Sequence, residues 1–176
     1  MHLSLESAGV IEREADEFAS NLLMPGDVLR ARITSQDVDL HLLSGLAKAF
    51  GVSFEALCIR FIKYTEKRAI LLHWDNGFLK YEWRSKSAIL SKTRIRRISE
   101  PVEPLRNTVA AEESISQEWD GLEMPAAVWC VDEQPYMKLL EFKHSYSGHD
   151  RVLTLLILED AEPRRWDNSW EDPDTA

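Results

Sequence analysis

Apolar residues recur at helical spacing in the first part of the chain and in alternating or continuous runs after it. A helix is expected from about Ala8 to Met24, because one stripe of apolar positions repeats every three to four residues and must be buried. The stripe consists of Ile11, Ala15, Phe18 and Leu22. Pro25-Gly26 ends this helix, since proline cannot continue the hydrogen-bond ladder and glycine suits the exit turn.

Further helices follow this first one. A short helical piece is expected from Asp27 to Ile33. A stronger apolar pattern then runs through "DLHLLSGLAKAF" and stops at Gly51, and Ser53 is a good N-cap for a helix from Phe54 to Tyr64.

After residue 67 the pattern changes to that of β-strands. "AILLHW" and "FLKYEW" flank Asp75-Asn76-Gly77, which is a strong hairpin signal. "KTRIRRI", "AAVWCV", "MKLLEFKHSY" and "RVLTLLILED" also have the texture of strands, whereas "NTVAAEESISQEWDG" is expected to be a loop or briefly helical. Helices followed by an antiparallel sheet predict the α+β class. We expect three parts: helical residues 1–66, a β-rich domain at 67–160 and an acidic tail at 161–176.

Composition and charge narrow the class of protein. The 176 residues are 44% hydrophobic and 29% charged, which is typical of a soluble globular protein, and the net charge of -9 opposes non-specific binding to nucleic acid. No apolar run is long enough to predict a membrane span, and the N-terminus lacks the features of a secretory signal. Cys58 and Cys130 match no paired metal spacing, so a cytoplasmic location is the simplest interpretation.

Two carboxylates of the first helix lie at the edge of its apolar stripe. Glu12 and Asp16 are four residues apart, so they are neighbours on one face, where like charges repel unless something compensates. In one interpretation they pair with nearby arginines such as Arg13 or Arg30. In the other, Glu12 binds a cation directly, and Asp16 orients a histidine ligand by accepting its second N–H.

The stretch "EREADEFASNLLMP", Glu12 to Pro25, resembles the glutamate-ligand helix of the ImmA/IrrE family of zinc metallopeptidases and of thermolysin-like enzymes. The segment "LAKAFGVSFEALCIRFIKY" also resembles a helical region of that family, so the likeness covers residues 8–66. The resemblance implies a zinc cofactor in the full-length family, with Glu12 as third zinc ligand and Asp16 as its supporting carboxylate. It also implies proteolysis of a helix-turn-helix repressor in stress or mobile-element regulation.

The catalytic motif of that family, H-E-x-x-H, is absent from this sequence. The motif would supply two histidine ligands and the general base, and in the family it precedes the glutamate helix. We therefore expect a truncated gene product, a misplaced start or a natural remnant, with no catalytic residue, no peptidase activity and no zinc bound by this chain alone.

Two further features point to partners. "LSGLAKAFGVSFEALCIRF" has the texture of a helix-turn-helix, but its second helix starts with Phe54 and Glu55, so we interpret the pair as a packing module. Lys92, Arg94 and Arg96 share one face of the expected strand and form a candidate surface for nucleic acid or a protein partner. The alternative to a metallopeptidase-like protein is thus a non-enzymatic regulatory protein that binds a repressor or DNA.

Overall fold

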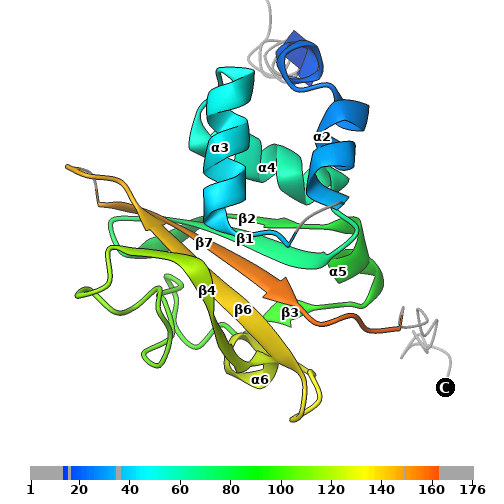
Figure 1. Cartoon of the computed structure of the whole chain (residues 1–176). Helices are drawn as coiled ribbons and strands as arrows, with labels where there is room; N and C mark the ends of the chain where they lie inside the picture. Colours follow the sequence, from blue (N-terminus) through cyan, green and yellow to red (C-terminus); the bar gives the residue numbers. More distant parts are fainter. Residues whose placement is uncertain (1–13, 16, 35–36, 149, 163–176) are drawn as a thin grey trace, which may run out of the picture.

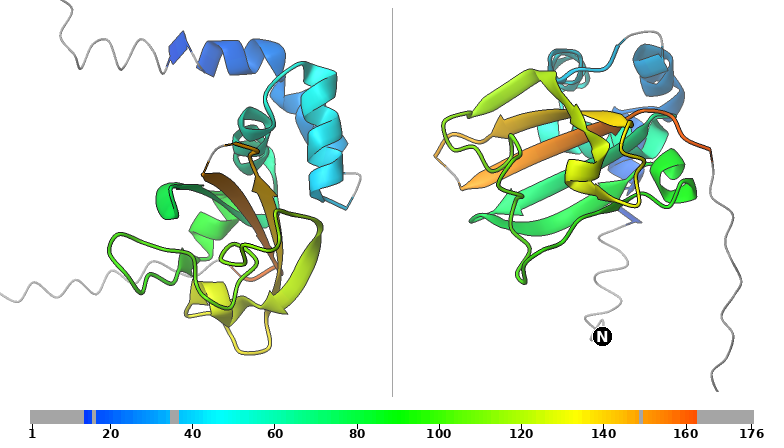
Figure 2. Two further views of the ribbon diagram at one scale, coloured as in Figure 1. Left: turned by 90° about the vertical axis from the view of Figure 1, so that its left-hand side faces the viewer. Right: turned by 90° about the horizontal axis from the view of Figure 1, so that it is seen from below.

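Three helices cover one face of a five-stranded antiparallel sheet (Figure 1). The computed structural model describes residues 14–15, 17–34, 37–148 and 150–162. The helices are α2 (Gly26–Thr34), α3 (Leu40–Phe50) and α4 (Phe54–Tyr64). Seen from below the sheet, they lie behind it (Figure 2). The predicted α+β class is confirmed.

Local chemistry explains where the helices begin and end. The Asp39 carboxylate accepts the Leu42 N–H at 2.7 Å and caps α3, and the Ser53 hydroxyl accepts the Ala56 N–H at 3.1 Å and caps α4. Gly51 ends α3 at φ 67°, in the left-handed region that favours glycine. No single helix in the described part of the chain has the length and apolar character to cross a membrane. The pair α3 and α4, bent by 109°, passes that test only when taken together.

The sheet has the strand order β2-β1-β7-β6-β4, and every neighbouring pair is antiparallel. Its strands are β1 (Arg68–Asp75), β2 (Phe78–Arg84), β4 (Gln117–Pro125), β6 (Lys138–Ser145) and β7 (Arg151–Leu158). The predicted hairpin joins β1 to β2, where Asn76 and Gly77 both have positive φ. A second, two-stranded sheet pairs β3 (Arg94–Ile95) with β5 (Cys130–Val131), and two short helices, α5 (Lys86–Leu90) and α6 (Ala126–Trp129), complete the described elements.

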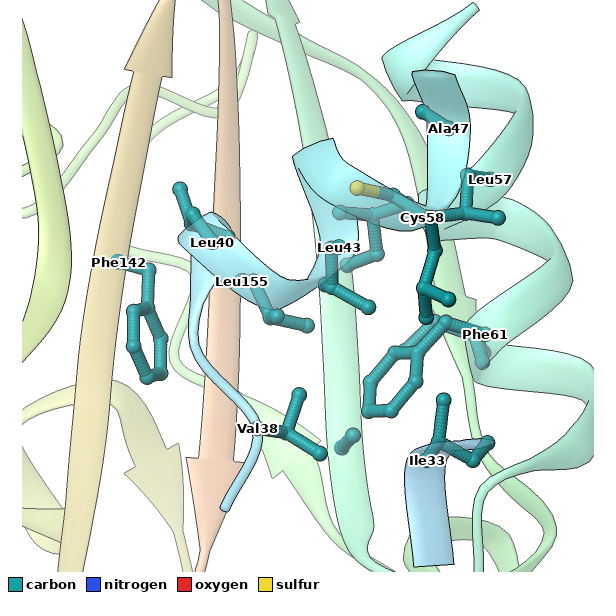
Figure 3. Close-up of a cluster of buried hydrophobic side chains, with 14 of the residues drawn as sticks. Ile33, Val38, Leu40, Leu43, Ala47, Leu57, Cys58, Phe61, Phe142 and Leu155 are labelled. Carbon is teal, nitrogen blue, oxygen red and sulfur yellow. The ribbon is translucent and has the colours of Figure 1, made fainter. Parts of the chain in front are cut away.

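The main core lies between the helices and the sheet. Figure 3 shows Leu43 of α3 close to Leu155 of β7, with Phe142 of β6 on one side of them and Phe61 of α4 and Ile33 of α2 on the other. All five belong to one cluster of buried residues. The helices and the sheet therefore share one hydrophobic cluster. A second cluster covers the other face of the sheet, with the buried Trp74 and Trp129 as its largest members.

Two strand predictions and one loop prediction differ from the structure. Residues 126–131 form α6 before a short β5, because Ala126 and Trp129 are buried on one side of a single helical turn. The strand expected over 92–98 is reduced to Arg94–Ile95. β4 extends into the segment expected to be a loop, and its pairing with β6 is irregular between Glu118 and Leu122. Gly121 in that stretch has φ 89°, and a Cβ there would lie 2.7 Å from the Phe142 ring.

The start of α2 is packed closely against the end of α4. A Cβ on Gly26 would lie 2.3 Å from the Tyr64 ring, so only glycine fits with the ring in its present place. The guanidinium groups of Arg60 and Arg30 lie 4.6 Å and 5.5 Å from the centre of the same ring. The Tyr64 ring therefore packs between two guanidinium groups and occupies space that a side chain at position 26 would need.

Candidate functional site

The helix before Pro25 turns its apolar side outward. Its described residues, 14–15 and 17–23, are called here the N-terminal helical segment. Phe18 is 71% exposed, Leu22 68% and Leu23 51%, and Ala15 is exposed as well. The prediction that this stripe is buried is wrong for Ala15, Phe18 and Leu22, because no described element packs against it. Ile11, the remaining member, lies outside the described residues.

The polar side of the same segment faces the protein. Glu17, Asn21 and Met24 follow one another at helical spacing along this side. Glu17 forms an ion pair with Lys63 of α4, and the Lys63 ammonium lowers the pKa of the Glu17 carboxyl. Asn21 and the Met24 carbonyl bind Arg60 of the same helix. The segment is thus attached through hydrogen bonds and charge.

Arg60 is the central group of this attachment. Its side chain donates to the Met24 carbonyl from Nε at 3.2 Å and from Nη2 at 3.0 Å, and from Nη2 to Asn21 Oδ1 at 2.7 Å. The residue is only 4% exposed. A cation at a helix C-terminus satisfies carbonyls that have no partner within the helix and complements the helix dipole. The sequence pattern did not predict this role, although an arginine between the buried Leu57 and Phe61 signals a buried partner.

A hollow of about 820 Å³ lies beneath the N-terminal helical segment. Glu17 and Ser20 line it from the segment, Ile59 and Lys63 from α4, and Trp83 from β2. The segment therefore has an exposed apolar side and, opposite it, an underside that combines polar and apolar groups.

The two acids predicted to serve a metal, Glu12 and Asp16, lie outside the described residues. Within the described part of the chain, no group of three or more His, Cys, Asp or Glu side chains could hold a metal ion. His2 and His149 also fall outside that part. The assignment of Glu12 and Asp16 therefore stays a prediction.

The described histidines have other neighbours. His41 lies 3.4 Å from Asp120 of β4, His73 Nδ1 lies 2.6 Å from Glu55 Oε1, and His144 Nδ1 lies 2.8 Å from Gln117 Oε1. They come from α3, β1 and β6, so their ring nitrogens do not converge as tetrahedral zinc requires. These residues do not fit a zinc centre.

On the predicted basic surface, Arg94 and Arg96 already bind acceptors within the protein. Arg94 forms an ion pair with Asp132 at 2.8 Å, and Arg96 donates to the Ala127 carbonyl at 3.1 Å. Both are exposed, whereas Lys92 is half-buried in the turn before β3. The three side chains alternate with the buried Thr93 and Ile95, as the sequence pattern indicates.

The α3–α4 pair contributes its apolar sides to the core against the sheet. Leu57, Cys58 and Phe61 of α4 are buried there, and Glu55 in its first turn is bonded to His73 of β1. Phe54 stacks on Trp119 with ring centres 6.2 Å apart. This arrangement is that of a packing module and leaves the start of α4 against the sheet.

The stretch that ends in Leu-Leu-Met-Pro, the buried arginine that binds its end and helices α2–α4 lie together in the N-terminal part of the chain. Residues 3–61 match the protein-family model Peptidase_M78, described as the IrrE N-terminal-like domain. The N-terminal part of this chain therefore has the resemblance to ImmA/IrrE metallopeptidases that the sequence motif indicates. No curated protein matches the chain significantly.

Proposed function

We propose that this polypeptide is a metallopeptidase-like protein of the ImmA/IrrE type that lacks peptidase activity of its own and holds a protein partner. The family match over residues 3–61 supports the relationship. The observation that carries the binding role is the outward apolar side of the N-terminal helical segment. Phe18, Leu22 and Leu23 are each at least half exposed, although their spacing is that of a buried helix face.

The proposed lack of activity follows from the chemistry of the family. A zinc peptidase needs three protein ligands, an open position for water and a base that takes the proton from that water. The sequence contains no H-E-x-x-H motif, so it offers Glu12 as a single ligand candidate and no general base.

The partner we propose is a protein that presents an amphipathic helix, and the family resemblance suggests a helix-turn-helix repressor. Helices bind one another when apolar faces meet and flanking charges are complementary. The exposed Glu14 flanks the apolar face of the segment. The matching helix would therefore have an apolar stripe bordered by lysine or arginine.

A binding assay with a matched control tests this role. The probe is a purified helix-turn-helix repressor from the same genome, with affinity measured by calorimetry. The double substitution Phe18→Asp and Leu22→Asp is expected to weaken binding by at least about tenfold, because two apolar contacts become charged. Ile98→Asp changes an equally exposed residue outside the segment and should leave the affinity unchanged. Equal affinities for all three proteins would refute the proposed face.

A separate assay tests the proposed inactivity. Purified polypeptide is incubated with zinc and with the repressor or an unfolded protein substrate. No cleavage and no stoichiometric zinc are expected. Zinc-dependent cleavage that Glu12→Gln abolishes would overturn this part of the proposal while leaving the binding role open to its own test.

The second candidate is a regulatory protein that contacts DNA. The exposed Arg94 and Arg96 favour it, whereas the net charge of -9 and the Arg94–Asp132 ion pair oppose it. A gel shift on random duplex DNA at low salt distinguishes the two candidates. Salt-sensitive binding that Arg94→Ala and Arg96→Ala weaken would favour DNA, and a flat result would remove it.

A further inference from the structure

A second hollow, of about 790 Å³, lies on the sheet face that is turned away from α3 and α4. Trp74 and Val152 line it from β1 and β7, Lys143 from β6, and Pro104 and Ala110 from the segment before β4. This volume is within the range of pockets that bind small molecules. The described lining combines these apolar walls with polar and charged groups, which include the cations Lys143 and Arg151 and the acids Glu103, Glu113 and Asp150.

Lys143 is the polar group of that lining with the most unusual environment. The residue is 3% exposed, yet the described residues give its ammonium one hydrogen bond, from Nζ to the Glu112 carbonyl at 2.7 Å. An ammonium has three N–H donors, so donors remain for a ligand. Burial lowers the pKa of Lys143, whereas the nearby negative charges of Glu141, Glu112 and Glu113 favour its ammonium form.

The nearest buried acid is already satisfied by other donors. Glu141 Oε1 accepts the Ala110 N–H at 2.7 Å, and its Oε2 accepts the Trp129 indole N–H at 2.9 Å. The carboxylate of Glu141 therefore fixes Ala110 and α6 to β6. It makes no salt bridge with Lys143 among the described residues, although its charge raises the pKa of Lys143. Lys143 keeps hydrogen-bonding capacity at the lining of the hollow.

We propose that this hollow binds a small organic monocarboxylate, whose carboxylate accepts from Lys143 and whose apolar body lies against Trp74. The acids Glu103, Glu113 and Asp150 are exposed around the lining. They repel anions of higher charge such as nucleotides, and they favour a ligand whose outer end is neutral or cationic. Free carboxylic acids and amino-acid zwitterions share this chemistry.

The unmodified protein provides the first test. Benzoate, the neutral analogue benzamide, phenylalanine and inorganic phosphate are titrated, and the chemical shifts of backbone amides are followed by NMR. Benzoate or phenylalanine should shift amides of Ala110, Lys143 and Val152. Benzamide should bind roughly tenfold or more weakly, because it cannot accept a charge-assisted bond. Tighter binding of phenylalanine than of benzoate would indicate that the acids around the lining bind the ammonium group of an amino acid.

Two lysine variants provide the second test. Lys143→Met keeps the aliphatic stem and removes the charge, and Lys138→Met removes an exposed lysine of the same strand that pairs with Glu123. Carboxylate affinity should fall at least tenfold in Lys143→Met and stay unchanged in Lys138→Met. Equal binding of benzoate and benzamide by the unmodified protein, shifts confined to other surfaces, or no shifts with any probe would overturn the proposal, whether or not Lys143→Met folds.

Discussion

The N-terminal helical segment and α4 are both amphipathic helices, yet they use their apolar sides in opposite ways. α4 buries Leu57 and Phe61 against the sheet, whereas the segment exposes Phe18 and Leu22 and turns Glu17, Asn21 and Met24 toward α4. The difference shows that periodicity reveals an apolar side of a helix but not what covers it. In this protein a buried arginine decides which side of the segment faces inward.

Alanine substitution of one phenylalanine in each helix should give the largest difference in the free energy of unfolding. Phe61→Ala removes a fully buried ring and is expected to cost about 3–5 kcal/mol of unfolding free energy, because it leaves a cavity. Phe18→Ala should change stability by no more than about 0.5 kcal/mol. Denaturant unfolding measures both, and a large loss in Phe18→Ala would mean that the segment is covered in solution.

Removal of the arginine anchor should have a smaller and local effect. Arg60→Met leaves the Met24 carbonyl without its side-chain donor, at an expected cost of about 1–3 kcal/mol. Amide hydrogen exchange should accelerate between residues 17 and 24 more than in β1 or β7. Lys48→Met, at an exposed position of α3, is the control, and uniform acceleration in Arg60→Met would contradict a local anchor.

The exposed ion pair between the two helices should contribute still less. Lys63→Met removes the partner of Glu17. Because both side chains are more than half exposed, we expect the free energy of unfolding to fall by only about 0–1 kcal/mol. The loss should disappear at high salt, because screening weakens exposed pairs. A salt-independent loss would show that the Lys63 stem contributes by packing.

The smallest effect concerns pH at the start of α4. His144 packs on Phe54 with ring centres 4.8 Å apart, and burial lowers the pKa of His144 from 6.5. The unfolded chain therefore takes up this proton first, so this contribution to stability is fully present above the ordinary histidine pKa and is lost as the pH falls through the lowered pKa of His144. His144→Asn should flatten this part of the pH profile of unfolding free energy. An unchanged profile would assign the slope to other groups.

Much of the fold could be predicted because short sequences contain its signals. Ser53 caps α4, Gly51 ends α3, and Asn76-Gly77 forms the hairpin turn, each for reasons that concern only a few neighbouring residues. β4 was not predicted, because its pairing with β6 is interrupted at Gly121 and no regular alternation remains. The buried turn of α6 has only four residues, and an apolar run of that length does not distinguish a helix from a strand.

The candidate sites depend on contacts between distant parts of the chain, so the sequence predicted less of them. Arg60 meets Asn21 across 39 positions, and Lys143 meets Glu112 across 31. Neither pairing follows from spacing. The family motif did predict the relationship that the match over residues 3–61 supports, because that motif lies within one short continuous stretch of the sequence.

Gly26 has a consequence for the direction of the N-terminal helical segment. The Tyr64 ring occupies the volume where a Cβ would be, so the exit from the N-terminal helical segment rests directly on the last turn of α4. A methyl group at position 26 would have to tilt that ring or swing the preceding helix about its base. A small rotation at the base becomes a larger displacement at Phe18, more than a helical turn away. The absence of a side chain at Gly26 thus determines the orientation of the apolar surface that we propose for partner binding.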